Sequence, residues 1–190
     1  MFDLPVVENI FAMLGTLFCS FQLVPQAHKN WQCKSTEGLS SNMLLLWAFS
    51  STLFGIYTII ESLSIPLILQ PQLFCIIALF CNVQCLYYDQ HVYPFDNGSM
   101  ERKFKYGVVF VVRLLVLGAI QAAGVIGVKI AEEKEITWPK TTLGIIPTAI
   151  LLCGFIPQFY EIYHAKMVQG ISLIFMALDI SGAAFSILSL

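Results

Sequence analysis

Residues 25–40 read PQAHKNWQCKSTEGLS, and residues 157–172 read PQFYEIYHAKMVQGIS. The two stretches align without a gap when the chain is shifted by 132 positions. Six positions then match: Pro25 with Pro157, Gln26 with Gln158, Lys34 with Lys166, Gly38 with Gly170, Leu39 with Ile171, and Ser40 with Ser172. Because both copies begin deep in an apolar segment and end in a polar one, the pattern predicts an internal repeat of one helix-to-loop junction.

A proline inside a helix has a defined physical effect. It removes a backbone donor and clashes with the carbonyl four residues earlier, which costs about 3 kcal/mol or more. In hydrocarbon the freed carbonyl needs a partner, so bends at Pro25 and Pro157 are tolerable only beside protein or water. Gln26 and Gln158 can hydrogen-bond the loosened backbone or a solute. We expect two hinges that face each other across a polar chamber in mid-membrane, the alternative being two merely structural bends.

The residues that follow each pair predict how the bent helix ends. Gly38 and Gly170 suit the chain reversal after a helix, where the backbone takes a positive φ. Ser40 and Ser172 suit the N-cap positions of the helices that come next, because a serine hydroxyl accepts from backbone N–H groups of the first turn.

The composition is that of a membrane protein. Hydrophobic residues make up 57% of the 190 residues, charged residues make up 12%, and the mean hydropathy is +0.77. So much apolar surface cannot be buried in so small a core, and lipid must be its solvent. Six segments are long enough to span a bilayer as helices: 8–30, 41–62, 65–88, 105–130, 142–164 and 170–190.

A third proline–glutamine pair, Pro71-Gln72, lacks the lysine and G-[LI]-S residues that follow the two repeated pairs. We expect it early in its helix, where proline costs little.

Several functional classes are excluded. The net charge of −2 and the lack of a basic run argue against nucleic acid as a partner. The six cysteines have no zinc-ligand spacing, so no metal site is expected. No nucleophile–base set or phosphate loop is visible, so we expect neither an enzyme nor a cofactor. Asp3 and Glu8 replace a basic signal-peptide region, and the first apolar segment should remain in the mature chain.

The distribution of Lys and Arg predicts the orientation. Three regions that we expect in the cytosol carry Lys29, Lys34, Arg102, Lys103, Lys105 and Lys166. Lys129, Lys134 and Lys140 lie on the other side, so the bias is moderate. It places the N-terminus in the lumen. The sequon Asn97-Gly98-Ser99 would then be cytosolic, and we interpret it as a turn.

The two repeat stretches resemble the PQ-loop repeat family, whose members include relatives of cystinosin, the vacuolar and lysosomal cationic amino-acid exporters and, more distantly, the SWEETs. The resemblance is carried by FQLVPQAHKNWQCKSTEGLS (21–40) and by FIPQFYEIYHAKMVQGISLIFMALDISGAAFSILSL (155–190). It implies an all-α integral membrane fold of two three-helix bundles joined by a linker helix.

The implied organisation has four parts. These are a first bundle (1–88), a cytosolic loop (89–104), a linker helix (105–130) and an incomplete second bundle (131–190). The seventh helix of the family is missing after Leu190, and we expect either a truncated product or a partner that supplies this helix.

Asp179 is the sharpest single candidate for function. An acid near the middle of a spanning helix costs about 2.5–3.5 kcal/mol on insertion scales. Burial favours the protonated carboxyl, so Asp179 is a candidate for proton coupling, a role that the cystinosin resemblance also implies. The alternative is a carboxylate that hydrogen-bonds Ser181 for packing. Its repeat mate is Trp47, so the two halves are not equivalent. Trp47, Asn82 and Gln84 are candidates for cavity lining, and residues 181–184, SGAA, suit close helix contact.

The resemblance implies a membrane transporter. Our first hypothesis is proton-coupled export of amino acids, such as cystine or cationic amino acids, from a vacuole or lysosome. The alternative is a non-transporting PQ-loop receptor or adaptor for nutrient signalling or trafficking, acting through loop 89–104. The partners are then a small solute, protons and the bilayer. The solute, the organelle and the oligomeric state, including a homo-oligomer, are left open.

Overall fold

The computed structural model describes the backbone of residues 4–88, 100–166 and 171–188. Over these residues the chain forms eight helices: α1 (Leu4–Phe21), α2 (Val24–Cys33), α3 (Ser41–Ile60), α4 (Ile65–Tyr88), α5 (Met100–Glu133), α6 (Trp138–Cys153), α7 (Phe155–Ala165) and α8 (Leu173–Leu188). They form six segments, because α1 with α2 and α6 with α7 are each one segment with a break. The all-helical prediction is confirmed, and the sequon at 97–99 lies outside the described residues.

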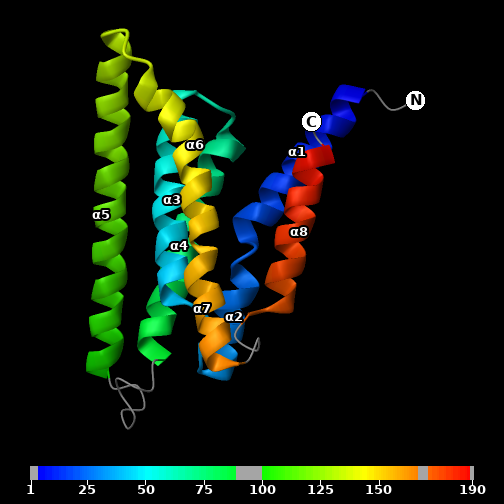
Figure 1. Cartoon of the computed structure of the whole chain (residues 1–190), viewed down its shortest axis with the longest axis vertical. Coiled ribbons are helices and arrows are strands. Elements are labelled where there is room, and N and C mark those ends of the chain that lie inside the picture. The colour runs from blue at the N-terminus through cyan, green and yellow to red at the C-terminus, as the bar shows by residue number, and fades with distance from the viewer. Residues whose placement is uncertain (1–3, 89–99, 167–170, 189–190) are drawn as a thin grey trace.

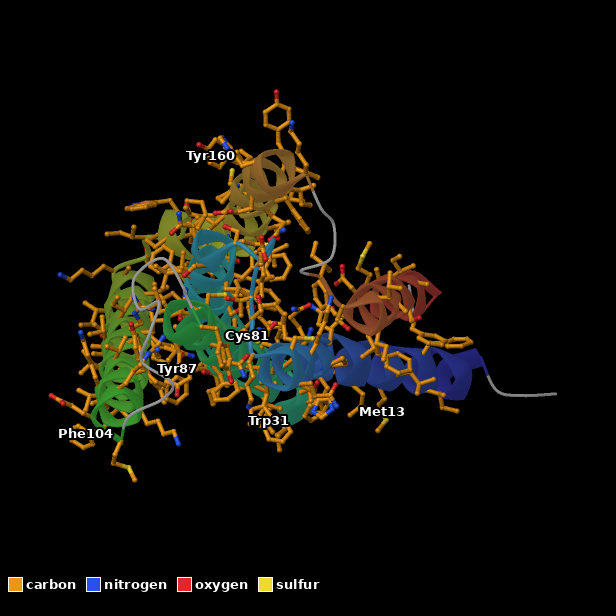
Figure 2. All side chains as sticks on the ribbon, turned by 90° about the horizontal axis from the view of Figure 1, so that it is seen from below. Met13, Trp31, Cys81, Tyr87, Phe104 and Tyr160 are labelled. Carbon is orange, nitrogen blue, oxygen red and sulfur yellow. The ribbon has the colours of Figure 1, made fainter. Side chains whose placement is uncertain are left out.

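Four helical stretches are long and apolar enough to cross a membrane. They are Ser41–Ile60, Ile65–Tyr88, Met100–Glu133 and Trp138–His164. The outward side chains are apolar, as lipid contact requires. Figure 2 shows Met13, Trp31, Phe104 and Tyr160 pointing outward from the helices, and each is more than half exposed. The protein is therefore a multi-pass integral membrane protein.

The helices form a body with an arm beside it (Figure 1). We call α3, α4, α5 and α6 the body: α3 packs against the other three. We call α1 and α8 the arm, because they lie side by side along their length, apart from α5 and α6 in Figure 1. Both pairings across the chain, α1 with α8 and α3 with α6, join an early helix to a late one. The ends of three body helices are also tied together, because Lys140 Nζ lies 2.9 Å from Glu61 and 3.2 Å from Glu132.

Both breaks lie upstream of the repeated prolines. Gln22 and Leu23 separate α1 from α2, and Gly154 alone separates α6 from α7. Pro25 and Pro157 therefore lie in the first turn of a new helix instead of bending a continuous one. This position is cheap, because the first N–H groups of a helix have no partner within that helix.

Pro71 has the opposite outcome. We expected it near the start of its helix, but it lies inside α4, beyond the first turn, and its side chain is buried. The expected segment 65–88 has the same start as α4, so the error was to place Pro71, six residues beyond that start, in the inexpensive first turn.

The predicted serine caps are confirmed. Ser40 Oγ accepts from Met43 N at 3.3 Å at the start of α3. Ser172 Oγ accepts from Phe175 N at 3.4 Å at the start of α8. The same cap thus occurs in both copies of the repeat.

The helix ends differ in part from the prediction. Gly38 has a φ of 79°, as expected, while Gly170 lies outside the described residues. Lys34 and Lys166 end α2 and α7 in the left-handed conformation, with φ values of 51° and 50°. The sequence did not predict this, because lysine has no special preference for positive φ.

The arm depends on one close helix contact. A Cβ on Gly182 would lie 2.7 Å from Cys19 Sγ and 3.3 Å from Cys19 N, so only glycine fits between α8 and α1. Phe185 stacks on Phe11 and Phe18 one turn further along. The SGAA strip therefore makes the close contact that its small residues predicted.

We expect Gly182→Ala to lower the unfolding temperature of the detergent-solubilised protein, because the added methyl group must push α1 and α8 apart. Gly127→Ala is the matched control, since a Cβ at Gly127 on α5 meets nothing within 4 Å. The control should be neutral or stabilising by roughly 0.5–1 kcal/mol, the usual gain when alanine replaces a helical glycine. Equal melting temperatures for the two variants would contradict the close contact.

Candidate functional site

Gln26 and Gln158 each bind the backbone of the other repeat. Gln158 Oε1 accepts from Ser40 N at 2.8 Å, and its Nε2 donates to Gly38 O at 2.7 Å. Gln26 Oε1 accepts from Ser172 N at 2.6 Å. We call these reciprocal bonds the crossed latch. Both glutamines are buried, at 0% and 3% exposed.

The crossed latch satisfies backbone groups that would otherwise be buried without partners. Ser40 and Ser172 each stand at the start of a helix, where backbone N–H groups have no intrahelical acceptor. An unpaired polar group in hydrocarbon costs several kcal/mol. We expected the glutamines to bond loosened backbone near their own bends. They bond the reversal of the opposite half instead, so the latch joins the halves.

A buried polar chain supports Gln26. Its Nε2 donates to Asn30 Oδ1 at 2.8 Å, and Asn30 Nδ2 donates to Gln84 Oε1 at 3.0 Å. Gln84 Nε2 in turn donates to Ala27 O at 3.1 Å. Beside this chain, Lys29 Nζ donates to Ile171 O at 2.9 Å, a further bond between the halves. Asn30 was not singled out from the sequence, although it follows Gln26 by one helical turn and so shares its face.

A second polar chain reaches the latch from α5. Arg113 donates to Asn82 Oδ1. Asn82 Nδ2 donates to Ser41 O at 2.7 Å and to Ser41 Oγ at 2.9 Å, next to the residue that Gln158 binds. Asn82 and Gln84 were candidates for cavity lining. The structure places both in the chains that support the latch.

A cavity of about 260 Å³ lies between the arm and the body. On the side of the arm and its break it is lined by Cys19, Gln22 and Asp179. On the body side it is lined by Ser50, Ser51 and Phe54 of α3, Gln70, Pro71 and Phe74 of α4, and Pro147, Thr148 and Leu151 of α6. This is room for several waters or one small solute. Pro25, Gln26, Pro157 and Gln158 do not line it and lie beyond one end of it.

The cavity wall on the body side contains two prolines inside helices. Pro71 interrupts α4 and Pro147 interrupts α6. Ser50 Oγ donates to Pro147 O at 2.6 Å and so joins α3 to α6 at this level. No functional role was predicted for Pro71, because it lacks the tail of the two repeated pairs. Its position in the cavity wall depends on how α4 packs against the other helices, and a local sequence pattern does not predict that packing.

Asp179 is an acid without a cationic partner in the cavity. None of the lining residues is Lys, Arg or His, and the carboxyl group is half-buried. The Gln22 side chain lines the same side of the cavity and interacts with the carboxyl group. Gln22 is only 7% exposed, and its Oε1 is buried with no hydrogen-bond partner. The site therefore offers two acceptors, the carboxylate and an amide oxygen, to a ligand that brings a proton or a cationic donor.

Trp47, the repeat mate of Asp179, fills space instead of lining the cavity. It is 3% exposed, and its Nε1 donates to Leu151 O at 3.0 Å. The rings of Phe74, Phe155 and Phe175 surround it. The two halves thus present a carboxyl group and an indole at equivalent positions.

We expect Gln158→Leu to destabilise the protein more than a glutamine substitution on the surface. The variant leaves the buried Ser40 N and the part-buried Gly38 O without these partners, and a buried group left unpaired costs about 1–3 kcal/mol. Gln32→Leu is the matched control, because Gln32 is exposed on α2. Thermal unfolding in detergent measures the difference. If both variants melt together, Gln158 does not hold the halves as described.

Comparisons with known proteins agree with the repeat. A family model described as PQ loop repeat matches residues 7–67 and 141–190. An uncharacterised protein of Schizosaccharomyces pombe is 37% identical over 183 residues, which is 96% of this chain and 62% of the relative. An uncharacterised membrane protein of Saccharomyces cerevisiae is 30% identical over 94% of this chain and 55% of the relative. A cystinosin homolog of Caenorhabditis elegans is 27% identical over 90% of this chain and 44% of the relative. The chain spans less than two thirds of the length of each.

Proposed function

Since the chain belongs to the PQ-loop repeat family, we propose that it is a membrane transporter which exports amino acids in a proton-coupled cycle. The observation that carries the proposal is the cavity between arm and body, which contains the uncompensated carboxyl group of Asp179. The likeness to a cystinosin homolog supports this class of function.

Alternating access requires a barrier that can open on one side of a central site. The crossed latch has the properties of such a barrier. It joins the two halves through a few hydrogen bonds, and it lies between the cavity and the helix ends that carry Lys34 and Lys166. These basic ends are the predicted cytosolic side. The described conformation then has its latch closed toward the cytosol, with the cavity on the lumenal side.

The cavity chemistry suits an amino acid. An ammonium group can bind Asp179 and the free Gln22 Oε1, both of which are acceptors. Phe54 and Phe74 offer apolar surface for an aliphatic or disulfide-containing side chain. Cystine and cationic amino acids are therefore the first solutes to test. A protonated Asp179 still has a carbonyl oxygen that accepts from an amino group, so a proton and the solute can occupy the cavity together. Their release on the same side would couple the two movements.

We further propose a vacuolar or lysosomal membrane, with the N-terminus in the lumen. An acidic lumen would supply the protons that drive export, and the positive-inside bias supports this orientation.

Transport can be tested with purified protein in liposomes that have an acidic interior. We expect efflux of radiolabelled cystine, lysine or arginine to rise with the pH difference, and to fall at least tenfold in Asp179→Asn. Asparagine keeps the shape of the side chain but can neither carry charge nor exchange a proton. Glu161→Gln is the matched control, because Glu161 is an exposed acid on α7, away from the cavity.

Unchanged pH-dependent flux in Asp179→Asn would overturn the assignment of Asp179. A wild-type protein with no flux of any of these solutes, but with capture of a cytosolic partner through residues 89–104, would favour the receptor or adaptor hypothesis.

A further inference from the structure

The two helix breaks make equivalent contacts, just as the two sequence motifs match. Under the shift of 132 positions, Gln22 of the first break corresponds to Gly154 of the second, and Asp179 corresponds to Trp47. Gln22 and Asp179 line the same side of the cavity, where their side chains interact. Gly154 lies against Trp47, since a Cβ there would be 2.7 Å from the Cδ1 and Nε1 atoms of the indole. The same two positions therefore meet in both halves, with different chemistry.

The second break is held by groups that do not titrate, and its indole is buried and does not line the cavity. Trp47 is wedged between aromatic rings and bonded to Leu151 O, in the last turn before the break. Gly154 has no side chain that could exchange partners. A change of charge in the cavity leaves all of these contacts intact.

At the first break, Gln22 lies beside a group whose charge can change. Gln22 can donate to an ionised Asp179 only through Nε2, while its Oε1 has no partner. When Asp179 takes up a proton, the carboxyl becomes a donor and Oε1 becomes its natural acceptor. When it binds an ammonium group, Oε1 can accept from the same group. Either event changes what Gln22 binds, and Gln22 is itself one of the two residues of the break.

We propose that the two breaks are unequal hinges. The α1–α2 break responds to the occupancy of Asp179 through Gln22, which acts as a positioning residue, and the α6–α7 break is fixed by Trp47. The inference deepens the proposed function, since it takes Asp179 as the cation-binding group. Cys19 is the only other titratable residue that lines the cavity, and the lining residues of α3, α4 and α6 carry no ionisable side chain.

The arm would transmit the response. Gly182 and Cys19 hold α8 and α1 in close contact next to Asp179, so the two helices move together. Below the break, Gln26 and Lys29 of α2 are bonded to Ser172 N and Ile171 O at the start of α8. A change in the angle between α1 and α2 would therefore strain the hydrogen bonds of the crossed latch.

The proposal can be tested by hydrogen–deuterium exchange on the detergent-solubilised protein at one fixed pH. Asp179→Asn represents the neutral carboxyl. We expect it to change amide exchange in residues 20–27 at least threefold and to leave residues 152–158 unchanged. In a Gln22→Met background, Asp179→Asn should have no further effect on residues 20–27, because the coupling residue is already absent.

Two results would overturn the proposal. One is an equal response of both breaks to Asp179→Asn, and the other is an undiminished response in Gln22→Met. Gln22→Asn provides a second variant if Gln22→Met misfolds, since it keeps the amide but shortens its reach, and it should weaken the response. The measurement needs no solute and no flux. A failure to transport would therefore overturn the proposed function alone.

Discussion

The requirement that buried backbone groups be paired in lipid constrains the whole structure. Each copy of the repeat is followed by a new helix, and the N–H groups at the start of that helix, at Ser40 and Ser172, are buried and have no acceptor within the helix. The chain solves this problem across its halves, because Gln158 serves Ser40 and Gln26 serves Ser172. Neither half can complete its own hydrogen bonding, and the same contacts that stabilise the fold lie where a transporter needs a barrier.

Much of the architecture could be predicted from the sequence. Spanning segments need long apolar runs, and the serine caps follow local rules of helix initiation, so both were found. The position of the breaks was not, because a proline is as compatible with the first turn of a new helix as with a bend. The hydrogen-bond partners of Gln26 and Gln158 could not be predicted either, since they depend on packing between segments far apart in the chain.

The residues of the cavity also divide into those that could be predicted from the sequence and those that could not. Asp179 could be singled out because an acid in an apolar segment is costly and so conspicuous. Gln22, Ser50 and Pro147 carry no such signal, since short polar side chains and prolines occur in membrane helices for many reasons. Asn82 and Gln84 illustrate the converse. The helix that carries them was predicted. Whether each side chain faces the cavity or another helix depends on how α4 packs against α2, α3 and α5.

The pairing of Asp179 with Trp47 has a consequence for how a solute lies in the cavity. A pocket between two related halves would, with identical walls, accept an asymmetric molecule equally well in either of two reversed poses. Here one wall carries a carboxyl group and the equivalent position is occupied by an indole packed among phenylalanines. For the solute proposed above, only one of the two orientations would place the amino end against the acid, because the equivalent position holds a buried indole that does not line the cavity.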